Sequence, residues 1–152
     1  MIFLPRRLLA VAAFLIFVLS TGCGGPGKGT PLSGKLVLPK DMKLQKDDSV
    51  NITFVPDGGD VTRAATCKFN ADDLSFVADT SETTGVLPGK YKITVSIIPY
   101  QGTLGSEARV RQINDGINKQ FDETMTKLSY EVTAGGANTI TIDLAKSTIT
   151  KN

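Results

Sequence analysis

The chain has 152 residues, two cysteines and no histidine, and its 17 Lys and Arg nearly balance its 15 Asp and Glu. A sequence without histidine cannot build a Ser-His-Asp triad and lacks the commonest zinc ligand. The near-neutral charge provides no positive field for a polyanion, so we expect no nucleic-acid partner. The length is that of one domain, with a core that needs no disulfide framework.

The first 22 residues are typical of a lipoprotein signal peptide. A pair of arginines precedes an apolar run from Leu8 to Leu19. This run is shorter than the ~20 apolar residues that span a membrane, which favours secretion and cleavage. Cleavage after Gly22 leaves Cys23 as the N-terminal residue, where it can carry acyl chains such as palmitate. The alternatives are an ordinary thiol after a conventional signal peptide, or an uncleaved anchor.

Residues 23–30 are predicted to be the lipidated cysteine and a flexible tether, because glycines dominate this stretch. Such a tether reaches at most about 25 Å, so the domain stays close to the membrane. Gly24 stands where inner-membrane lipoproteins often have a retention Asp. We therefore expect a lipid-anchored protein of the bacterial cell envelope, with the outer membrane favoured over the inner membrane.

Apolar and polar residues alternate over residues 31–146, which predicts an all-β domain followed by a C-terminal tail at 147–152. Pro99 removes a ladder donor and ends the longest predicted strand, which we expect at the centre of its sheet. Seven short strands at this spacing favour an Ig-like β-sandwich of two sheets. The predicted strands are Lys35–Leu38, Val50–Phe54, Arg63–Phe69, Ser75–Ala78, Lys90–Ile97, Leu128–Val132 and Ile140–Leu144.

Clusters of turn-forming residues predict how some of these strands connect. Residues 70–73 are expected to join the third and fourth strands as a hairpin, and residues 134–138 to join the last two. Leu87–Tyr91 has the L-x-G-x-Y spacing of a tyrosine corner. In such a corner Gly89 allows the bend, and Tyr91 buries its ring while its hydroxyl bonds to upstream backbone. Both residues are predicted to be structural.

Several segments resemble the signature of a known family. Val50–Pro56 is similar to its V-x-V-x-F-x-P strand, Asn70–Phe76 to its T-D-x-D-G-x-F turn, and Gly85–Val95 to its G-x-x-P-G-x-Y-x-V-x-V block. The family is the carboxypeptidase regulatory-like domain, a transthyretin-like β-sandwich often carried by small bacterial lipoproteins. With the closing segment Leu128–Leu144, the likeness extends over Pro31–Leu144. The resemblance implies a non-catalytic accessory or interaction module and supplies no catalytic residue.

Two further sequence patterns give only weak support for catalysis or metal binding. Asp79-Thr80-Ser81 approaches the D-[ST]-G of aspartic proteases but lacks the glycine and a second copy. Asp57, Asp60, Asp72 and Asp73 lie in predicted turns, where we interpret them as turn formers rather than calcium ligands. We predict no enzyme, no catalytic residue, no metal site and no cofactor.

The second cysteine, Cys67, has no partner for a disulfide within the chain if Cys23 is acylated. It alternates with Ala65 and Phe69 in an extended run. We therefore expect a buried thiol that packs as a small hydrophobe.

The long connection from Pro99 to Lys127 is predicted to hold one short helix. Ser106 is placed to cap this helix, Val110 and Ile113 to bury, and Gly116 to end it. Long loops on a rigid sandwich often carry binding surfaces, so this connection is the candidate contact surface.

Its candidate contact residues are Tyr100, Arg109, Arg111 and Phe121. The two arginines either meet an anionic group or stay solvated. Because the chain has no Trp, stacking on a sugar ring depends on Tyr100, Phe121 or Tyr130. Two functions fit these observations. The preferred one is a lipid-anchored interaction or scaffold module for an unknown envelope protein, and the alternative is a β-sandwich that binds a small ligand, a glycan or calcium.

Overall fold

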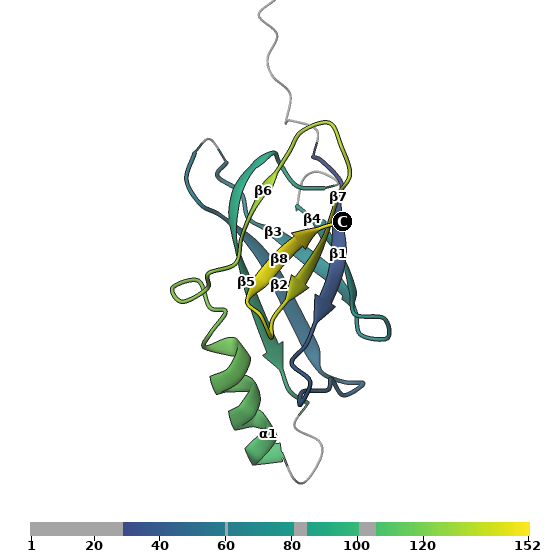
Figure 1. Cartoon of the computed structure of the whole chain (residues 1–152), viewed down its shortest axis with the longest axis vertical. Coiled ribbons are helices and arrows are strands. Elements are labelled where there is room, and N and C mark those ends of the chain that lie inside the picture. Colours follow the sequence, from purple (N-terminus) through teal and green to yellow (C-terminus); the bar gives the residue numbers. More distant parts are fainter. Residues whose placement is uncertain (1–28, 60, 81–84, 101–105) are drawn as a thin grey trace, which may run out of the picture.

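The computed structural model describes residues 29–59, 61–80, 85–100 and 106–152. This part of the chain is mostly β-structure, with a helical segment in the long connection (Figure 1). No helix in the described residues is long and apolar enough to cross a membrane. The strands are β1 (Leu32–Val37), β2 (Ser49–Pro56), β3 (Ala65–Asn70), β4 (Ser75–Asp79), β5 (Gly89–Ile98), β6 (Ser129–Val132), β7 (Asn138–Asp143) and β8 (Thr148–Lys151). The helical segment consists of α1 (Ser106–Ile113) and the π-helical turn η1 (Asn114–Asn118).

The strands form one sheet in the order β6-β5-β2-β3-β4-β1-β7-β8. Neighbours are antiparallel except β1 and β7, which run parallel. The sheet curls round its hydrophobic core until it is nearly barrel-shaped (Figure 1). The all-β prediction is confirmed. The sequence predicted seven strands in two sheets, whereas the described residues form eight strands in one, because β1 bonds to β4 on one side and to β7 on the other.

The pairing near the C-terminus differs from the prediction. β6 pairs with β5, which places Tyr130 opposite Tyr91, and β7 pairs with β1, so the predicted hairpin across residues 134–138 is wrong. Residues 147–152 were predicted as a tail, but most of them form β8, which folds back on β7 after Ser147 adopts a φ of 53°. β5 was expected at the centre and lies second from the β6 edge. The alternation of apolar and polar residues identifies a strand, but it does not identify the strand beside it, because any two amphipathic strands can pair.

The hairpin of β3 and β4 is confirmed, with Asn70 opposite Ser75. Asp73 stabilises its turn by accepting hydrogen bonds from the Ser75 backbone N–H (3.0 Å) and hydroxyl (2.6 Å). Leu74 occupies the left-handed region with a φ of 57°. These local bonds explain why residues 70–73 predicted the turn correctly.

The core is built from the inward-facing residues of the strands. Phe54 and Tyr91 are fully buried, and their rings meet edge to face with centroids 6.1 Å apart. The ring centroids of Phe76 and Phe54 lie 6.5 Å apart. Burying such a side chain contributes roughly 1.5–3 kcal/mol. Gly34 in β1 lies in this core, and a Cβ there would stand 2.2 Å from the Ile140 carbonyl oxygen and 2.6 Å from the Phe76 ring.

The tyrosine corner is confirmed. Tyr91 donates from its hydroxyl to the carbonyl of Leu87 (2.8 Å), and burial raises the pKa of Tyr91, which keeps this donor protonated. Gly89 has a φ of 150°, and a Cβ at this position would stand 2.3 Å from Val61. Gly89 therefore makes the bend possible in two ways, through its backbone conformation and through its lack of a side chain.

The predicted helix is present as α1, but its C-terminal end differs from the prediction. Ile113 is buried as expected, and Val110 is half-buried. Gly116 does not end the helical segment, because η1 continues through it and buries Ile117 on the core.

The residues after α1 cover the part of the β5 edge that β6 leaves free. The side-chain amide of Asn118 accepts from the N–H of Ile97 (2.7 Å) and donates to its carbonyl (2.9 Å), as a neighbouring strand would. The carbonyl of Phe121 accepts from the N–H of Val95 (3.0 Å). These bonds protect an edge that would otherwise be open to another chain, and they hold α1 and η1 against the sheet.

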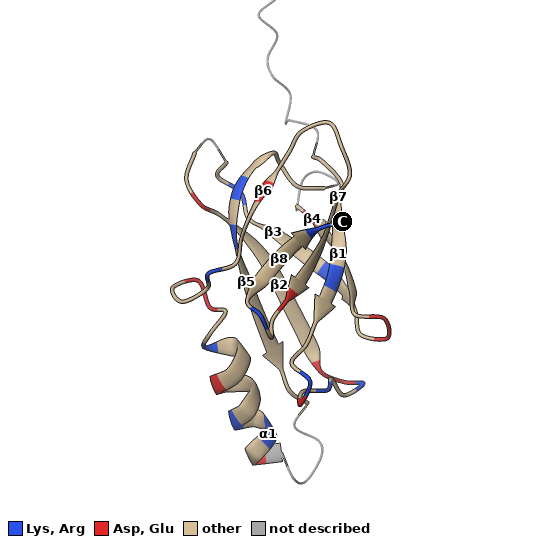
Figure 2. Ribbon diagram, viewed as in Figure 1, with Lys and Arg blue, Asp and Glu red and all other residues tan. Residues whose placement is uncertain are grey.

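The two ends of the molecule carry different features. At one end, Thr30 exchanges two backbone hydrogen bonds with Val86 (2.7 and 2.9 Å), close to the tyrosine corner. Thr30 was assigned to the tether, yet it is buried and belongs to the fold. Helix α1 lies at the opposite end (Figure 1). Lys and Arg are interspersed with Asp and Glu over the strands and over α1 (Figure 2).

Candidate functional site

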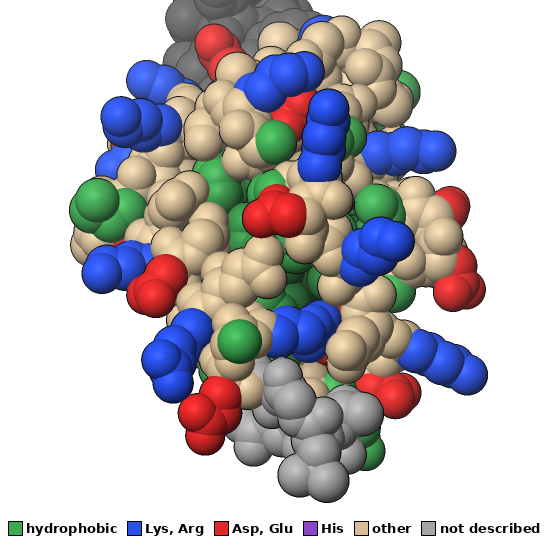
Figure 3. Space-filling view, turned by 60° about the horizontal axis from the view of Figure 1, so that its bottom comes forward, with side chains coloured by type: hydrophobic (Ala, Val, Ile, Leu, Met, Phe, Trp, Pro, Cys, Tyr) green, Lys and Arg blue, Asp and Glu red, His purple; other side chains and the backbone are tan. Residues whose placement is uncertain are grey.

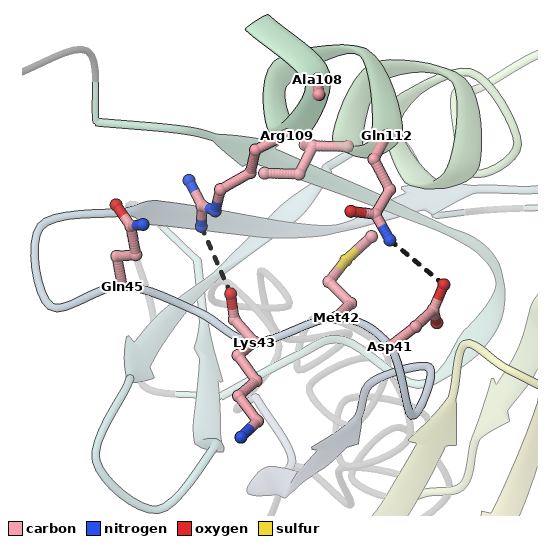
Figure 4. Close-up of a pocket in the computed structure, with 8 residues that line it drawn as sticks. Asp41, Met42, Lys43, Gln45, Ala108, Arg109 and Gln112 are labelled. Carbon is pink, nitrogen blue, oxygen red and sulfur yellow. Dashed lines mark hydrogen bonds between the residues drawn. The ribbon is translucent and has the colours of Figure 1, made fainter. Parts of the chain in front are cut away.

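A cleft opens at the end of the molecule that carries α1. It lies between α1 and the connection from β1 to β2, and its volume is about 480 Å³ (Figure 4). We name it the α1 cleft. It is lined by Asp41, Met42, Lys43, Gln45, Ala108, Arg109, Gln112 and Ile113.

An ion pair beside the cleft fastens α1 to the residue before β2. The side chain of Asp48 is fully buried, and that of Arg109 is only 20% exposed. Both carboxylate oxygens of Asp48 accept hydrogen bonds from the Arg109 guanidinium. The carboxylate also accepts from the backbone N–H of Gln45 (2.7 Å) and of Tyr100 (3.0 Å). Four donor groups from three residues, Arg109, Gln45 and Tyr100, therefore converge on one buried carboxylate.

These bonds set the charge state of Asp48. Burial acts to raise its pKa, but the hydrogen bonds from Arg109, Tyr100 and Gln45 outweigh burial, so the pKa of Asp48 lies below its ordinary value of 3.8. The carboxylate is therefore ionised at neutral pH. Because Arg109 is committed to this internal anion, its role is to position α1.

Two further hydrogen bonds cross the cleft. The amide of Gln112 donates to the carboxylate of Asp41 (3.1 Å), and the guanidinium of Arg109 donates to the backbone carbonyl of Lys43 (3.3 Å). Figure 4 shows that both bonds run from α1 to the facing connection. They hold the two walls of the cleft at a fixed separation.

Met42 and Ile113 provide the apolar floor of the cleft, and both are buried, with 8% and 1% exposure. Methionine adapts its shape to different apolar partners. An apolar floor below a polar rim is the usual chemistry of a site that receives one apolar group and orients it by hydrogen bonds. The cleft has the features of a binding site.

The four predicted contact residues have different positions. Tyr100 is 50% exposed, and Arg111 is exposed and pairs with the acidic residue one turn earlier on α1. Arg109 meets an anion within its own chain, Asp48. Phe121 is 2% exposed, so its prediction as a contact residue is wrong: the chain turns inward after η1 and packs this ring into the core. Tyr130 is half-buried and bonds through its hydroxyl to Asn138 (3.0 Å).

Sequence reasoning missed most of the residues that shape the cleft. Asp48 and Arg109 are 61 residues apart in the sequence, and neither belongs to a motif that would predict their pairing. Met42 and Gln112 likewise lie outside any strand pattern. The only sequence feature that points to the cleft is the length of the connection before β2, and this length does not say which residues it brings to α1.

Gly22 and Cys23, the predicted cleavage and lipidation residues, lie outside the described residues.

The described carboxylates considered for calcium do not gather at one place, because Asp72 and Asp73 lie in the β3–β4 turn and Asp57 follows β2. Asp57 lies beside Lys90 (3.8 Å) and Lys92 (3.9 Å), and Asp73 belongs to the β3–β4 turn. Asp60 lies outside the described residues. Among the residues that the structure describes, no three His, Cys, Asp or Glu side chains gather as a metal-binding group.

Cys67 is half-buried and packs against the core, next to Ala65 and Phe69 of the same strand. Burial raises the pKa of Cys67 to about 12. The thiol is therefore protonated at neutral pH and serves as packing, since only the thiolate is a strong nucleophile.

Figure 3 shows the molecule turned so that the α1 end comes forward. Hydrophobic side chains lie in the recessed centre of this face, and charged side chains of both signs surround them. A recessed apolar centre with a polar rim is typical of interaction surfaces. Comparison of the chain with protein-family models, curated proteins and solved structures found no match.

Proposed function

We propose that this protein is a non-catalytic, lipid-anchored module of the bacterial cell envelope that binds a partner protein through the α1 cleft. The observation that carries the proposal is that the cleft lies beside α1, and that α1 is at the end of the molecule opposite to the start of the described chain (Figure 1). A domain held by an acylated Cys23 would be attached at the end opposite to α1, which leaves the α1 end free to turn away from the membrane. In this orientation the cleft is available to a partner while the domain stays anchored.

The sequence before Thr30 supports the anchor. Its arginine pair, short apolar run and Gly22-Cys23 junction fit a lipoprotein signal peptide, and the glycine-rich residues after Cys23 fit a short tether. Two or more acyl chains on one residue are enough for stable membrane attachment. The bonds between Thr30 and Val86 would then hold the end of the tether against the folded domain.

The local structure supports the family relation, which we propose as a carboxypeptidase regulatory-like, transthyretin-like domain. The segments that carry the resemblance form β2, the β3–β4 hairpin, and the tyrosine corner with β5. Domains of this family are accessory modules, which agrees with a chain that lacks histidine.

The first experiment tests the anchor and the partner together. A tagged full-length chain is expressed in bacteria, with and without Cys23→Ala, and is labelled with a palmitate analogue. We expect acylation and membrane fractionation of the parent chain, and neither in the variant. Chemical cross-linking and mass spectrometry should then recover a discrete envelope protein with the anchored form. Recovery of the same proteins from both forms would overturn the proposal.

A second function is favoured by the volume of the cleft, about 480 Å³, which falls within the range of small-ligand sites. The half-exposed Tyr100 near Asp48 would offer a ring for stacking on a sugar. Thermal unfolding of the full chain with a panel of envelope sugars, short peptides and ions tests this function. A ligand at about 100 times its Kd adds about 2.7 kcal/mol, which shifts the melting temperature measurably.

A further inference from the structure

A second recess lies on the other side of the segment that forms one wall of the α1 cleft. This recess has a volume of about 510 Å³ and is bounded by residues 36–44 and by the turn between β3 and β4. We name it the hairpin recess. Met42 and Lys43 line both the α1 cleft and the hairpin recess, so residues 40–44 form a ridge between the two.

Most of the residues that line the hairpin recess are apolar. Leu38, Leu44 and Leu74 are partly buried and pack against the core, so each leaves part of its side chain at the surface. Val37 at the same recess is 40% exposed. The two recesses therefore place apolar surface on both sides of one short ridge.

The ridge itself is basic. Lys40 and Lys43 are exposed, and neither forms an ion pair with a described residue. The side chain of Lys43 points away from α1 (Figure 4). Asp41, between them in sequence, is bonded to Gln112, and Asp72 lies at the hairpin side of the recess. Both lysines are thus free to meet an anion from another molecule.

We infer that the two recesses and the ridge together bind an acidic amphipathic segment of the partner protein. One apolar side chain enters the α1 cleft above Met42, a second enters the hairpin recess, and a carboxylate lies between them against Lys40 and Lys43. The inference rests on the proposed function and names the chemistry of its partner. Apolar anchors in recesses supply most of the affinity at such surfaces, and rim charges supply selectivity and association rate.

A selection experiment tests this chemistry even though the partner is unidentified. The purified full-length chain is used to select peptides of random sequence displayed on phage, and the affinities of the enriched peptides are measured by fluorescence anisotropy. We expect enriched peptides to carry two apolar residues with at least one Asp or Glu beside or between them. Their affinity should fall at least about 10-fold in the Lys40→Glu, Lys43→Glu double variant, and selection on that variant should enrich basic peptides instead.

Variants that fill each recess separate the two apolar anchors. Ala108→Trp places a large side chain in the α1 cleft, and Ala71→Trp places one in the hairpin recess. Each should weaken peptide binding at least about 10-fold, whereas the matched control Ala134→Trp, at the exposed β6–β7 connection, should not. Thermal melting confirms that each variant is folded, and the surface lysine variants provide the test if Ala71→Trp is not.

The inference is overturned if the enriched peptides lack acidic residues, or if they bind the tryptophan and lysine variants as tightly as the control. This result would leave the proposed function standing if a partner still cross-links to the α1 end in cells. Conversely, a chain that shows no membrane anchoring in cells but selects acidic amphipathic peptides would refute the proposed anchor and support the inferred binding chemistry.

Discussion

The end of the molecule that holds the tyrosine corner and the end that holds α1 are stabilised in different ways. At the corner, Tyr91 is fully buried and its neighbours are ordered by close packing and by the ladder of the sheet. At the other end, Ile113 of α1 is buried on the core, and polar side chains add further attachments, with Asp48–Arg109 as the buried ion pair. The sheet therefore forms a rigid frame, and the binding surface is added to it by bonds that single substitutions can remove.

The greatest loss of stability is expected from a change in the frame. Gly34→Ala would place a Cβ 2.2 Å from the carbonyl oxygen of Ile140, and backbone at that distance cannot yield easily. We expect a loss of about 3 kcal/mol or more in the free energy of unfolding, measured by urea denaturation. The control is Gly116→Ala in η1, where a Cβ meets nothing within 4 Å. An unchanged stability of Gly34→Ala would show that β1 is not tightly packed against the core.

The next effect is at the α1 end. Asp48→Asn removes the buried charge that Arg109 faces and disturbs a group that accepts four hydrogen bonds. We expect a loss of about 2 kcal/mol, because an unpaired charge is left in a mostly buried place. Hydrogen exchange should show faster exchange in α1, with β5 little changed. The control Asp72→Asn, at an exposed turn, should stay within about 0.5 kcal/mol of the parent.

A smaller effect tests the corner. Tyr91→Phe keeps the buried ring and removes only the hydroxyl that donates to Leu87. We expect a loss of about 1 kcal/mol, the usual net value of one hydrogen bond, with the fold intact by circular dichroism. A much larger loss would mean that the hydroxyl organises the corner as a whole rather than contributing one bond.

The weakest effect is a dependence on pH. The pKa of Asp48 is lowered in the folded state, so its contribution to stability is present above the ordinary value of 3.8 and is lost as pH falls through the folded value. The difference in stability between the parent and Asp48→Asn should therefore shrink as the pH is lowered from about 5 toward 2. Thermal melts across this range measure it, and a constant difference would show that the charge of Asp48 does not contribute.

The sequence predicted those features of the fold that depend on neighbouring residues. The tyrosine corner at Tyr91 and the turn at Asp73 are local, since the atoms that bond lie within four residues of one another. The apolar faces of most strands were predicted for the same reason, because alternation is a property of each strand alone. At the tyrosine corner, at the β3–β4 turn and on the strand faces, interactions between neighbouring residues were enough to predict the structure.

The features that the sequence did not predict depend on distant residues. β7 pairs with β1 on one side and with β8 on the other. Several strands have an apolar face that would allow them to pair, so the sequence of each strand does not identify its neighbour. The α1 cleft depends on Asp48 and Arg109, which meet only when the β1–β2 connection and α1 reach the same end of the sheet. The sequence predicts Arg109 as a contact residue for an anionic group, but it holds no information on which anion Arg109 meets. A contact of this kind is set by the tertiary fold.

The most direct test of the proposed function is photo-cross-linking in cells from the two ends of the molecule. A photoreactive amino acid replaces Ala108 in the α1 cleft or Ala134 at the opposite end, both exposed alanines, in the parent chain and in Cys23→Ala. We predict a discrete cross-linked protein from position 108 of the anchored chain and none from position 134. Cross-linking of a partner from position 134 alone, or equal cross-linking with and without Cys23, would contradict the proposal.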